Sequence, residues 1–139
     1  MTRVFADTGY WIAFLDPRDE LHGNALRITT KLERPVQLVT TEMVLTEFLN
    51  AFARYGAKLR VAASRFVDAL RARPDTLIIE QTHSQFEAAL DIYKSYTDKA
   101  WGLTDCASYT VMHTKGLDIA LTHDHHFEQM GFRALLRGS

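Results

Sequence analysis

Short runs of β-branched and other apolar residues alternate along the chain with longer segments whose apolar residues recur at helical spacing. The short runs are typical of buried strands, and the longer segments are typical of helices with one face on a core. Proline or glycine follows several of the helical segments, as expected where helices end. The pattern predicts strands at 2–7, 36–40, 76–80, 118–122 and 132–136, and helices at about 8–16, 22–33, 42–55, 58–72, 83–97, 105–114 and 123–130.

Strands that alternate with helices predict an α/β fold with a mostly parallel central sheet and helices on both faces. The 139 residues, of which 47% are hydrophobic and 24% charged, suit one ordinary globular domain, which we place at 1–139. The single cysteine, Cys106, excludes an internal disulfide and agrees with a cytoplasmic location. We see no signal segment and no apolar run of about 18 residues, so we expect no membrane association.

The net charge is −1, but the charges are unevenly distributed along the chain. Residues 54–73 contain six basic residues and one acid, whereas residues 74–105 contain six acids and two lysines. This asymmetry indicates either an anion-binding face beside a cation-binding face or two solvated helix exteriors. The basic residues of the first segment are Arg54, Lys58, Arg60, Arg65, Arg71 and Arg73, and the lysines of the second are Lys94 and Lys99.

Carboxylates stand where a parallel α/β sheet would bring distant segments together. Asp7 and Asp124 follow predicted strands, and Asp105 begins a predicted helix that Thr104 is placed to cap. Glu47 lies on the polar side of the helix at 42–55. For each acid alone, helix capping or solvent exposure is the better explanation. Together they would meet at the carboxyl ends of the strands, which is where such sheets bind ligands.

Acids crowded at one sheet edge would repel, and some would stay protonated unless a cation lay among them. Ligands that are all oxygen suit hard ions such as Mg²⁺ or Mn²⁺. Such an ion activates water and neutralises charge on a phosphate, so the reaction needs no nucleophilic side chain. Asp7, Glu47, Asp105 and Asp124 therefore predict metal-dependent phosphodiester hydrolysis, with RNA as the expected substrate.

Other chemistries fit the residues less well. Cys106 has no evident activating partner, and residues 123–126 (His-Asp-His-His) lack the cysteines or the HExxH spacing of common zinc sites. A phosphatase with Asp7 as nucleophile would want a second acid two residues later, where Gly9 stands. A non-catalytic module, with the acids as caps and the basic helix docking a protein or nucleic acid, stays an alternative.

Four segments of the chain resemble the PIN-domain family, in particular the VapC-type toxin ribonucleases of toxin–antitoxin pairs. They are residues 5–11 (FADTGYW), 44–47 (VLTE), 98–105 (DKAWGLTD) and 120–127 (ALTHDHHF), in the order that the family shows. The resemblance implies a Rossmann-like α/β/α sandwich, metal-dependent cleavage of RNA, and an acidic cluster at Asp7, Glu47, Asp105 and Asp124. Gly102 departs from the family, in which serine is frequent at this position, and so removes a hydroxyl near the site.

From this resemblance we expect Asp7, Asp105 and Asp124 to hold Mg²⁺ or Mn²⁺, directly or through water. We expect Glu47 to shape the site or to bind a second ion. Four further residues are expected to support the site: Thr8, Asp98, Thr104 and Thr122.

The basic stretch suggests phosphate contacts from Arg54, Lys58 and Arg60. Tyr10, Trp11 and Trp101 lie near the acidic motifs and are candidates for base stacking, although packing in the core explains them equally well. The resemblance also implies a homodimer and a groove around residues 42–73 for a small antitoxin protein. The dense apolar pattern there suits either a core or a partner. A housekeeping RNA-processing nuclease of the same fold is the alternative to a toxin.

Overall fold

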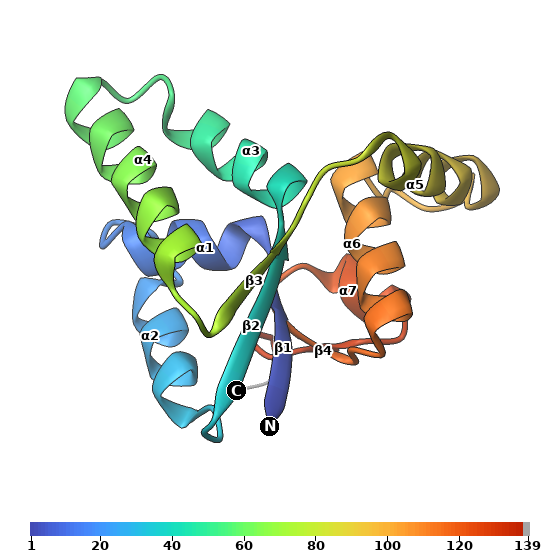
Figure 1. The fold of residues 1–139 in the computed structure, drawn as a ribbon, viewed down its shortest axis with the longest axis horizontal. Coiled ribbons are helices and arrows are strands. Elements are labelled where there is room, and N and C mark those ends of the chain that lie inside the picture. The colour runs from blue at the N-terminus through green and yellow to red at the C-terminus, as the bar shows by residue number, and fades with distance from the viewer. Residues whose placement is uncertain (138–139) are drawn as a thin grey trace.

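A sheet of five parallel strands forms the centre of the computed structural model, which describes residues 1–137 (Figure 1). The strand order is β3-β2-β1-β4-β5, and each neighbouring pair is parallel. This confirms the predicted fold class. The strands are β1 (Thr2–Ala6), β2 (Val36–Thr41), β3 (Thr76–Ile79), β4 (Ile119–Leu121) and β5 (Arg133–Ala134), the last being shorter than predicted.

Helices cover both faces of the sheet, as crossover connections between parallel strands require. In Figure 1 the helices α1 to α4 lie on one side of the sheet and α5 to α7 on the other. Within residues 1–137, no helix has both the length and the hydropathy needed to cross a bilayer. The helices are α1 (Thr8–Leu15), α2 (His22–Lys31), α3 (Glu42–Phe52), α4 (Ala57–Ala72), α5 (His83–Ser95), α6 (Leu103–Lys115) and α7 (His125–Gln129).

The central position of β1 determines where the acidic segments meet. β1 pairs with β4 in a register that sets Ala6 opposite Leu121, and the Asp7 N–H donates to the Leu121 carbonyl at 3.2 Å. The residues that follow these two strands, Asp7 and Thr122, are therefore neighbours although 115 positions separate them. This edge is the carboxyl end of the sheet, where α1 and the connection to α7 begin.

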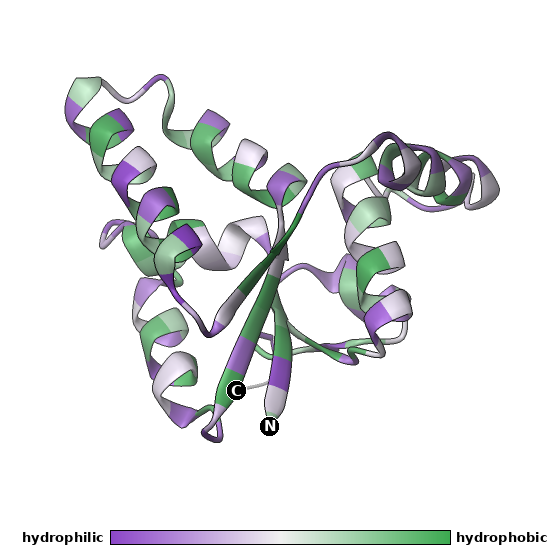
Figure 2. Ribbon diagram, in the orientation of Figure 1, coloured by the Kyte–Doolittle hydropathy of each residue, from purple (hydrophilic) through white to green (hydrophobic). Residues whose placement is uncertain are grey.

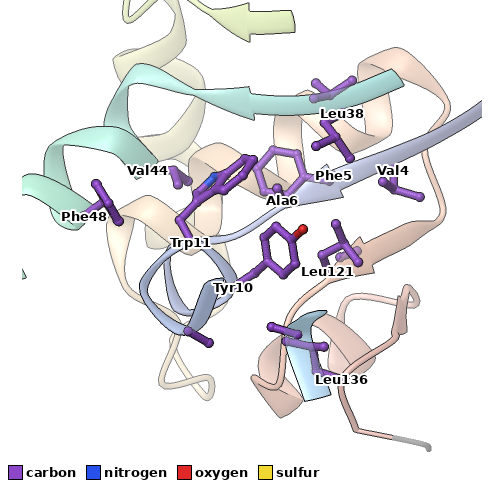
Figure 3. Packing of buried hydrophobic residues seen from close by; sticks show 14 of the residues in the cluster. Val4, Phe5, Ala6, Tyr10, Trp11, Leu38, Val44, Phe48, Leu121 and Leu136 are labelled. Atoms are coloured by element: carbon purple, nitrogen blue, oxygen red, sulfur yellow. The ribbon is translucent and has the colours of Figure 1, made fainter. Parts of the chain in front are cut away.

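The core is built from the apolar strands and from the inner faces of α1 and α3. Figure 2 shows β2 and β3 as mostly hydrophobic and the helices as mixed, which is the pattern of elements with one buried face. Figure 3 shows Tyr10 and Trp11 of α1 close to Phe5 of β1, and Phe48 of α3 belongs to the same buried cluster. Tyr10 and Trp11 are 1% and 2% exposed, so both belong to the core and offer no surface for base stacking.

We expect Phe48→Ala to lower the free energy of unfolding by about 3–5 kcal/mol, because it removes a fully buried ring. The Phe48 ring lies 5.2 Å from the Phe52 ring and 5.5 Å from the Phe66 ring, centroid to centroid. Urea denaturation measures the change. The control is Leu49→Ala on the same helix, where the side chain is 37% exposed and the expected loss is below about 1 kcal/mol. Equal losses for the two variants would contradict this picture of the core.

The predicted cap of α6 is wrong. The helix begins at Leu103, with Gly102 as its N-cap, and Thr104 is already inside the first turn. The Asp105 carboxylate reaches back and accepts the Gly102 N–H at 3.0 Å, which starts the helix earlier than a Thr104 cap would. Thr41 and Asp124 cap α3 and α7, since each side chain accepts a backbone N–H of the helix that follows it.

Candidate metal centre

A cleft of about 330 Å³ opens at the carboxyl ends of β1 and β4. We call it the acid cleft. It contains all four acids singled out from the sequence, delivered by the end of β1, the middle of α3, the first turn of α6 and the connection between β4 and α7. Its lining residues are Asp7, Thr8, Gly9, Leu21, Glu47, Asp105, Thr122, His123 and Asp124.

Asp7 is the most buried of these acids. It is 8% exposed and stands at the N-cap of α1, yet its carboxylate makes no capping hydrogen bond, so capping does not explain its presence. Burial raises the pKa of Asp7 to about 7, and the nearby charges of Asp105 and Asp124 act in the same direction. Hydrogen bonds from the Thr8 backbone and from the Thr122 hydroxyl lower the pKa but oppose this rise only in part. Without a cation, Asp7 is therefore close to half-protonated at neutral pH.

Thr122 connects two of the acids through one hydroxyl. Its Oγ1 donates to Asp7 Oδ2 at 3.0 Å and accepts the Asp124 N–H at 3.0 Å. Thr122 is 1% exposed, so these bonds are shielded from water. The hydroxyl thus holds Asp7 in position relative to the backbone that carries Asp124.

Asp105 and Asp124 each use one oxygen in a local hydrogen bond. Asp105 Oδ2 accepts the Gly102 N–H, and Asp124 Oδ1 accepts the His126 N–H at 2.9 Å. Burial is the main reason that the pKa of Asp105 is raised, and the charge of Asp124 adds to it. The capping role suggested for these acids is therefore real, but the second oxygen of each carboxylate lies outside these bonds.

His126 joins this cluster, although its sequence context did not single it out as a ligand. Its Nδ1 lies 3.3 Å from Asp105 Oδ2 and 3.2 Å from Asp124 Oδ1. That nitrogen is buried and makes no hydrogen bond to any residue from 1 to 137, since neither carboxylate is aligned for one. One ligand atom from each of Asp124, His125 and His126 lies within 4.8 Å of the others. His126 therefore lies against two of the acids, whereas His125 is exposed, and neither histidine lines the acid cleft.

Glu47 lies at the exposed side of the cleft. Its Oε1 accepts the Thr8 hydroxyl at 2.9 Å, which ties the middle of α3 to the start of α1. Thr8 and Thr122 thus each hold one acid in place. Two of the four supporting residues named from the sequence are in the cleft.

The other two supporting residues lie outside the lining of the acid cleft. Asp98 is exposed, and its carboxylate lies 3.5 Å from the Lys99 ammonium. Thr104 accepts the Ser108 hydroxyl on its carbonyl, inside α6. A Cβ built on Gly102 would lie 3.8 Å from Asp105 Oδ2, which is ordinary contact, so the structure does not require glycine there.

The three basic residues proposed for phosphate contacts also lie outside the acid cleft. Arg54 is in the connection between α3 and α4, and Lys58 and Arg60 are in the first turn of α4, all exposed. Arg60 Nη1 donates to the Ala53 carbonyl at 3.1 Å. A phosphate that these residues contact is therefore a different one from a phosphate held in the acid cleft.

The cleft fits a hard divalent cation. Asp7, Asp105 and Asp124 crowd a partly buried space, and the raised pKa values of the first two show that burial, with a smaller contribution from the neighbouring acids, disfavours their ionised forms. A cation among them would favour the ionised forms of Asp7 and Asp105. Cys106 offers no alternative nucleophile, because it is fully buried and burial raises its thiol pKa.

The family model of the PIN domain matches residues 4–133. The chain belongs to the PIN-domain family. Among curated proteins, this PIN domain is similar to the 23S rRNA-specific endonuclease VapC20 of Mycobacterium tuberculosis, in two strains. The two chains are 28% identical over 132 residues, which span 93% of this chain and 95% of the relative.

Solved structures agree with this placement. The PIN domain superposes on the Mycobacterium tuberculosis VapC20, a sarcin-ricin loop cleaving toxin, with a TM-score of 0.81 and 27% identity, over 93% of this chain and 95% of that one. VapBC2 from Rickettsia felis has a TM-score of 0.65 at 11% identity, with 96% of each chain covered. FitAcB from Neisseria gonorrhoeae has a TM-score of 0.61 at 14% identity, with 94% and 95% covered. The last two show the fold alone.

Proposed function

We propose that this PIN domain is a divalent-metal-dependent endoribonuclease and the toxin of a toxin–antitoxin pair. The observation that carries the proposal is the linked set of Asp7, Asp105 and Asp124 in one cleft, with the pKa of Asp7 raised to about 7. The ionised form of three carboxylates this close together is unfavourable without a cation, and it becomes favourable when Mg²⁺ or Mn²⁺ lies among them. The similarity to VapC20 supports RNA as the substrate.

In this proposal Asp7, Asp105 and Asp124 hold the cation, with His126 Nδ1 facing two of them. When bound, the cation supplies a Lewis acid that offsets negative charge on the phosphate. Thr122 and Gly102 keep the acids oriented by their hydrogen bonds to Asp7 and Asp105. Glu47, held by Thr8, stands where the attacking water or a second ion would enter. Water attacks phosphorus, one P–O bond breaks, and the leaving oxygen takes a proton.

The similarity to VapC20, a 23S rRNA-specific endonuclease, supports ribosomal RNA as the substrate. We propose that this PIN domain cleaves the sarcin-ricin loop of 23S rRNA, in the cytoplasm where ribosomes are found. The test incubates purified ribosomes with the protein and Mn²⁺ or Mg²⁺ and maps new RNA ends by primer extension. A single cut within that loop, absent with Asp105→Asn and with chelator, is the expected result. Cuts elsewhere would keep the nuclease and reject this target, and no cuts in any RNA would reject the nuclease.

An exposed groove between α3, α4 and β3 suits the proposed antitoxin. It has a volume of about 630 Å³, and Leu45, Leu49, Val67 and Ile78 provide apolar contacts within it. Leu49, which lines the groove, is 37% exposed and is therefore accessible to a partner. Co-purification with the product of a small adjacent gene, lost on Leu49→Asp, tests this partner. Mass measurement in solution tests the proposed homodimer, and a monomer at micromolar concentration would reject it.

The basic residues near the α3–α4 connection lead to a separate prediction. If Arg54 and Lys58 contact phosphates, replacing both with glutamine reduces the slope of log affinity against log salt by about 1.4, since each single-strand contact contributes about 0.7. RNA binding in EDTA, measured at several salt concentrations, gives the slope. Lys31→Gln, an exposed change on α2, is the control and should leave the slope unchanged. An unchanged slope in the double variant would remove these residues from the RNA interface.

A further inference from the structure

A second hollow, of about 650 Å³, lies between the C-terminal end of α5 and the start of α6. Its volume falls within the range of small-molecule sites in proteins, which is about 300–1,000 Å³. We call it the aromatic hollow, after the rings in its wall. The lining residues used below are Tyr93, Lys94, Tyr96, Lys99, Trp101 and Gly102.

Two tyrosines present open rings to this hollow. Tyr93 is 53% exposed and Tyr96 is 37% exposed. Tyr96 packs on Trp101 with ring centroids 4.8 Å apart, and Trp101 is itself 6% exposed and donates its Nε1–H to Gln129 Oε1 at 2.9 Å. Burial and this hydrogen bond hold Trp101 in place, and its ring in turn holds the Tyr96 ring. A flat ligand that stacks on Tyr96 meets a ring already held in place, so little conformational freedom is lost on binding.

The charge around the hollow is positive, against the trend of the surrounding sequence. Residues 74–105 contain six acids and two lysines, and both lysines, Lys94 and Lys99, line the hollow. Its lining contains no acidic side chain among the residues described. Lys99 has one nearby acid, Asp98, with an ammonium–carboxylate distance of 3.5 Å at the surface. The two cations therefore suit an anionic ligand that also carries a flat ring.

The hollow adjoins the acid cleft through Gly102. This residue lines the hollow, and its N–H donates to Asp105 Oδ2 at 3.0 Å, while Asp105 lines the acid cleft. A ligand seated in the hollow is thus next to one held at the acids. RNA has the required form, because its flat bases alternate with phosphates along one chain.

We propose that the aromatic hollow binds one unpaired base of the RNA substrate, next to the phosphate that is cleaved. The base stacks on Tyr96, with Tyr93 at its side, and Lys94 and Lys99 contact the flanking phosphates. Aromatic stacking of this kind accepts any base, whereas recognition of a particular base requires hydrogen bonds to its edge. This inference rests on the proposed function, since it assigns part of the RNA to a place beside the acids.

The test compares two variants with a matched control. Tyr96→Ala removes the stacking ring, and Tyr96→Phe keeps it. The control is Phe86→Ala, which removes a ring of α5 that is also 37% exposed but lies outside the hollow. The probe is an oligoadenylate of about ten nucleotides with one 2-aminopurine, whose fluorescence is quenched on stacking, titrated in EDTA to prevent cleavage. We expect about tenfold weaker binding and loss of quenching for Tyr96→Ala. The Tyr96→Phe and Phe86→Ala variants should bind like the parent.

Thermal melts show whether Tyr96→Ala is folded. If it is not, Tyr96→Phe still tests the proposal, because weaker binding by a variant that keeps the ring would contradict stacking as the basis of binding. Parent-like binding and quenching by folded Tyr96→Ala would overturn the proposal. So would a Tyr96→Ala variant that binds RNA normally but no longer forms a dimer or binds a protein partner, because the hollow would then be a protein interface. A parent protein that quenches the probe but cuts no RNA would reject the proposed function and leave the base site standing.

Discussion

We expect the replacement of Asp7 with asparagine to stabilise the metal-free protein and to abolish RNA cleavage. The folded-state pKa of Asp7 is about 7, against an ordinary value of 3.8, because the carboxyl is buried beside two other acids. A raised carboxyl pKa means that stability is fully present below pH 3.8 and is lost as the pH rises through 7. At pH 8 this loss corresponds to about 4 kcal/mol, which the neutral amide avoids.

Thermal melts in EDTA at pH 8 and pH 4 measure this effect. We expect Asp7→Asn to melt about 10 °C above the parent at pH 8 and within a few degrees of it at pH 4. In the cleavage assay the same variant should lose more than about 100-fold in rate, since even groups that only support metal ligands typically contribute 10–100-fold. A variant that gains stability and loses activity indicates that the native residue serves the function rather than the stability of the protein.

Asp91→Asn is the control for both measurements. Asp91 is an exposed acid on α5 outside the acid cleft, so its replacement should change neither the melting temperature at pH 8 nor the cleavage rate. If Asp7→Asn melts below the parent at pH 8, burial is not the dominant influence on this carboxyl. If the folded variant cuts RNA at the parent rate, Asp7 has no part in the reaction.

Metal affinity should rise with pH between 6 and 8. Asp7 is mostly protonated below its pKa of about 7, and a cation that binds there must displace this proton. We expect the dissociation constant for Mn²⁺ to be about tenfold higher at pH 6 than at pH 8. Asp105, whose pKa is also raised, faces the same space and adds to the dependence.

Isothermal titration of the metal-free protein with Mn²⁺ gives this result directly. Repeating the titration at pH 6 in buffers of different ionisation heat shows how many protons are released, and we expect about one. In Asp7→Asn the affinity should be weaker and its change between pH 6 and pH 8 smaller. Equal parent dissociation constants at the two pH values would show that the cation does not bind at Asp7.

The hydrophobic pattern was sufficient to predict the order and type of the elements. Strands and helices have different periods, and the five strand runs and seven helical segments are read from local sequence. The ends of the helices and strands were predicted less accurately, because they depend on which side chain makes a hydrogen bond to which backbone group. At α6, Asp105 reaches Gly102 and the helix starts before the predicted Thr104 cap.

The acids of the candidate site were also visible in the sequence, since Asp7 and Asp124 follow strands whose carboxyl ends share one edge. His126 was not, because a histidine in the first turn of a short helix has no local signature of its role. Its position between Asp105 and Asp124 depends on how α7 packs beside α6. The aromatic hollow also depends on tertiary packing, because nothing in the sequence pattern shows that the Trp101 ring would pack against the Tyr96 ring.

The sequence by itself therefore determined the fold class, the family and the identity of the four acids, because local periodicity and short motifs carry that information. Only the tertiary structure decided how those acids are held. The strand order places β1 beside β4, so that one hydroxyl of Thr122 contacts Asp7 and the Asp124 backbone. The tertiary structure also decided which carboxyls are buried enough for their pKa to rise, because burial depends on packing between segments that are distant in sequence.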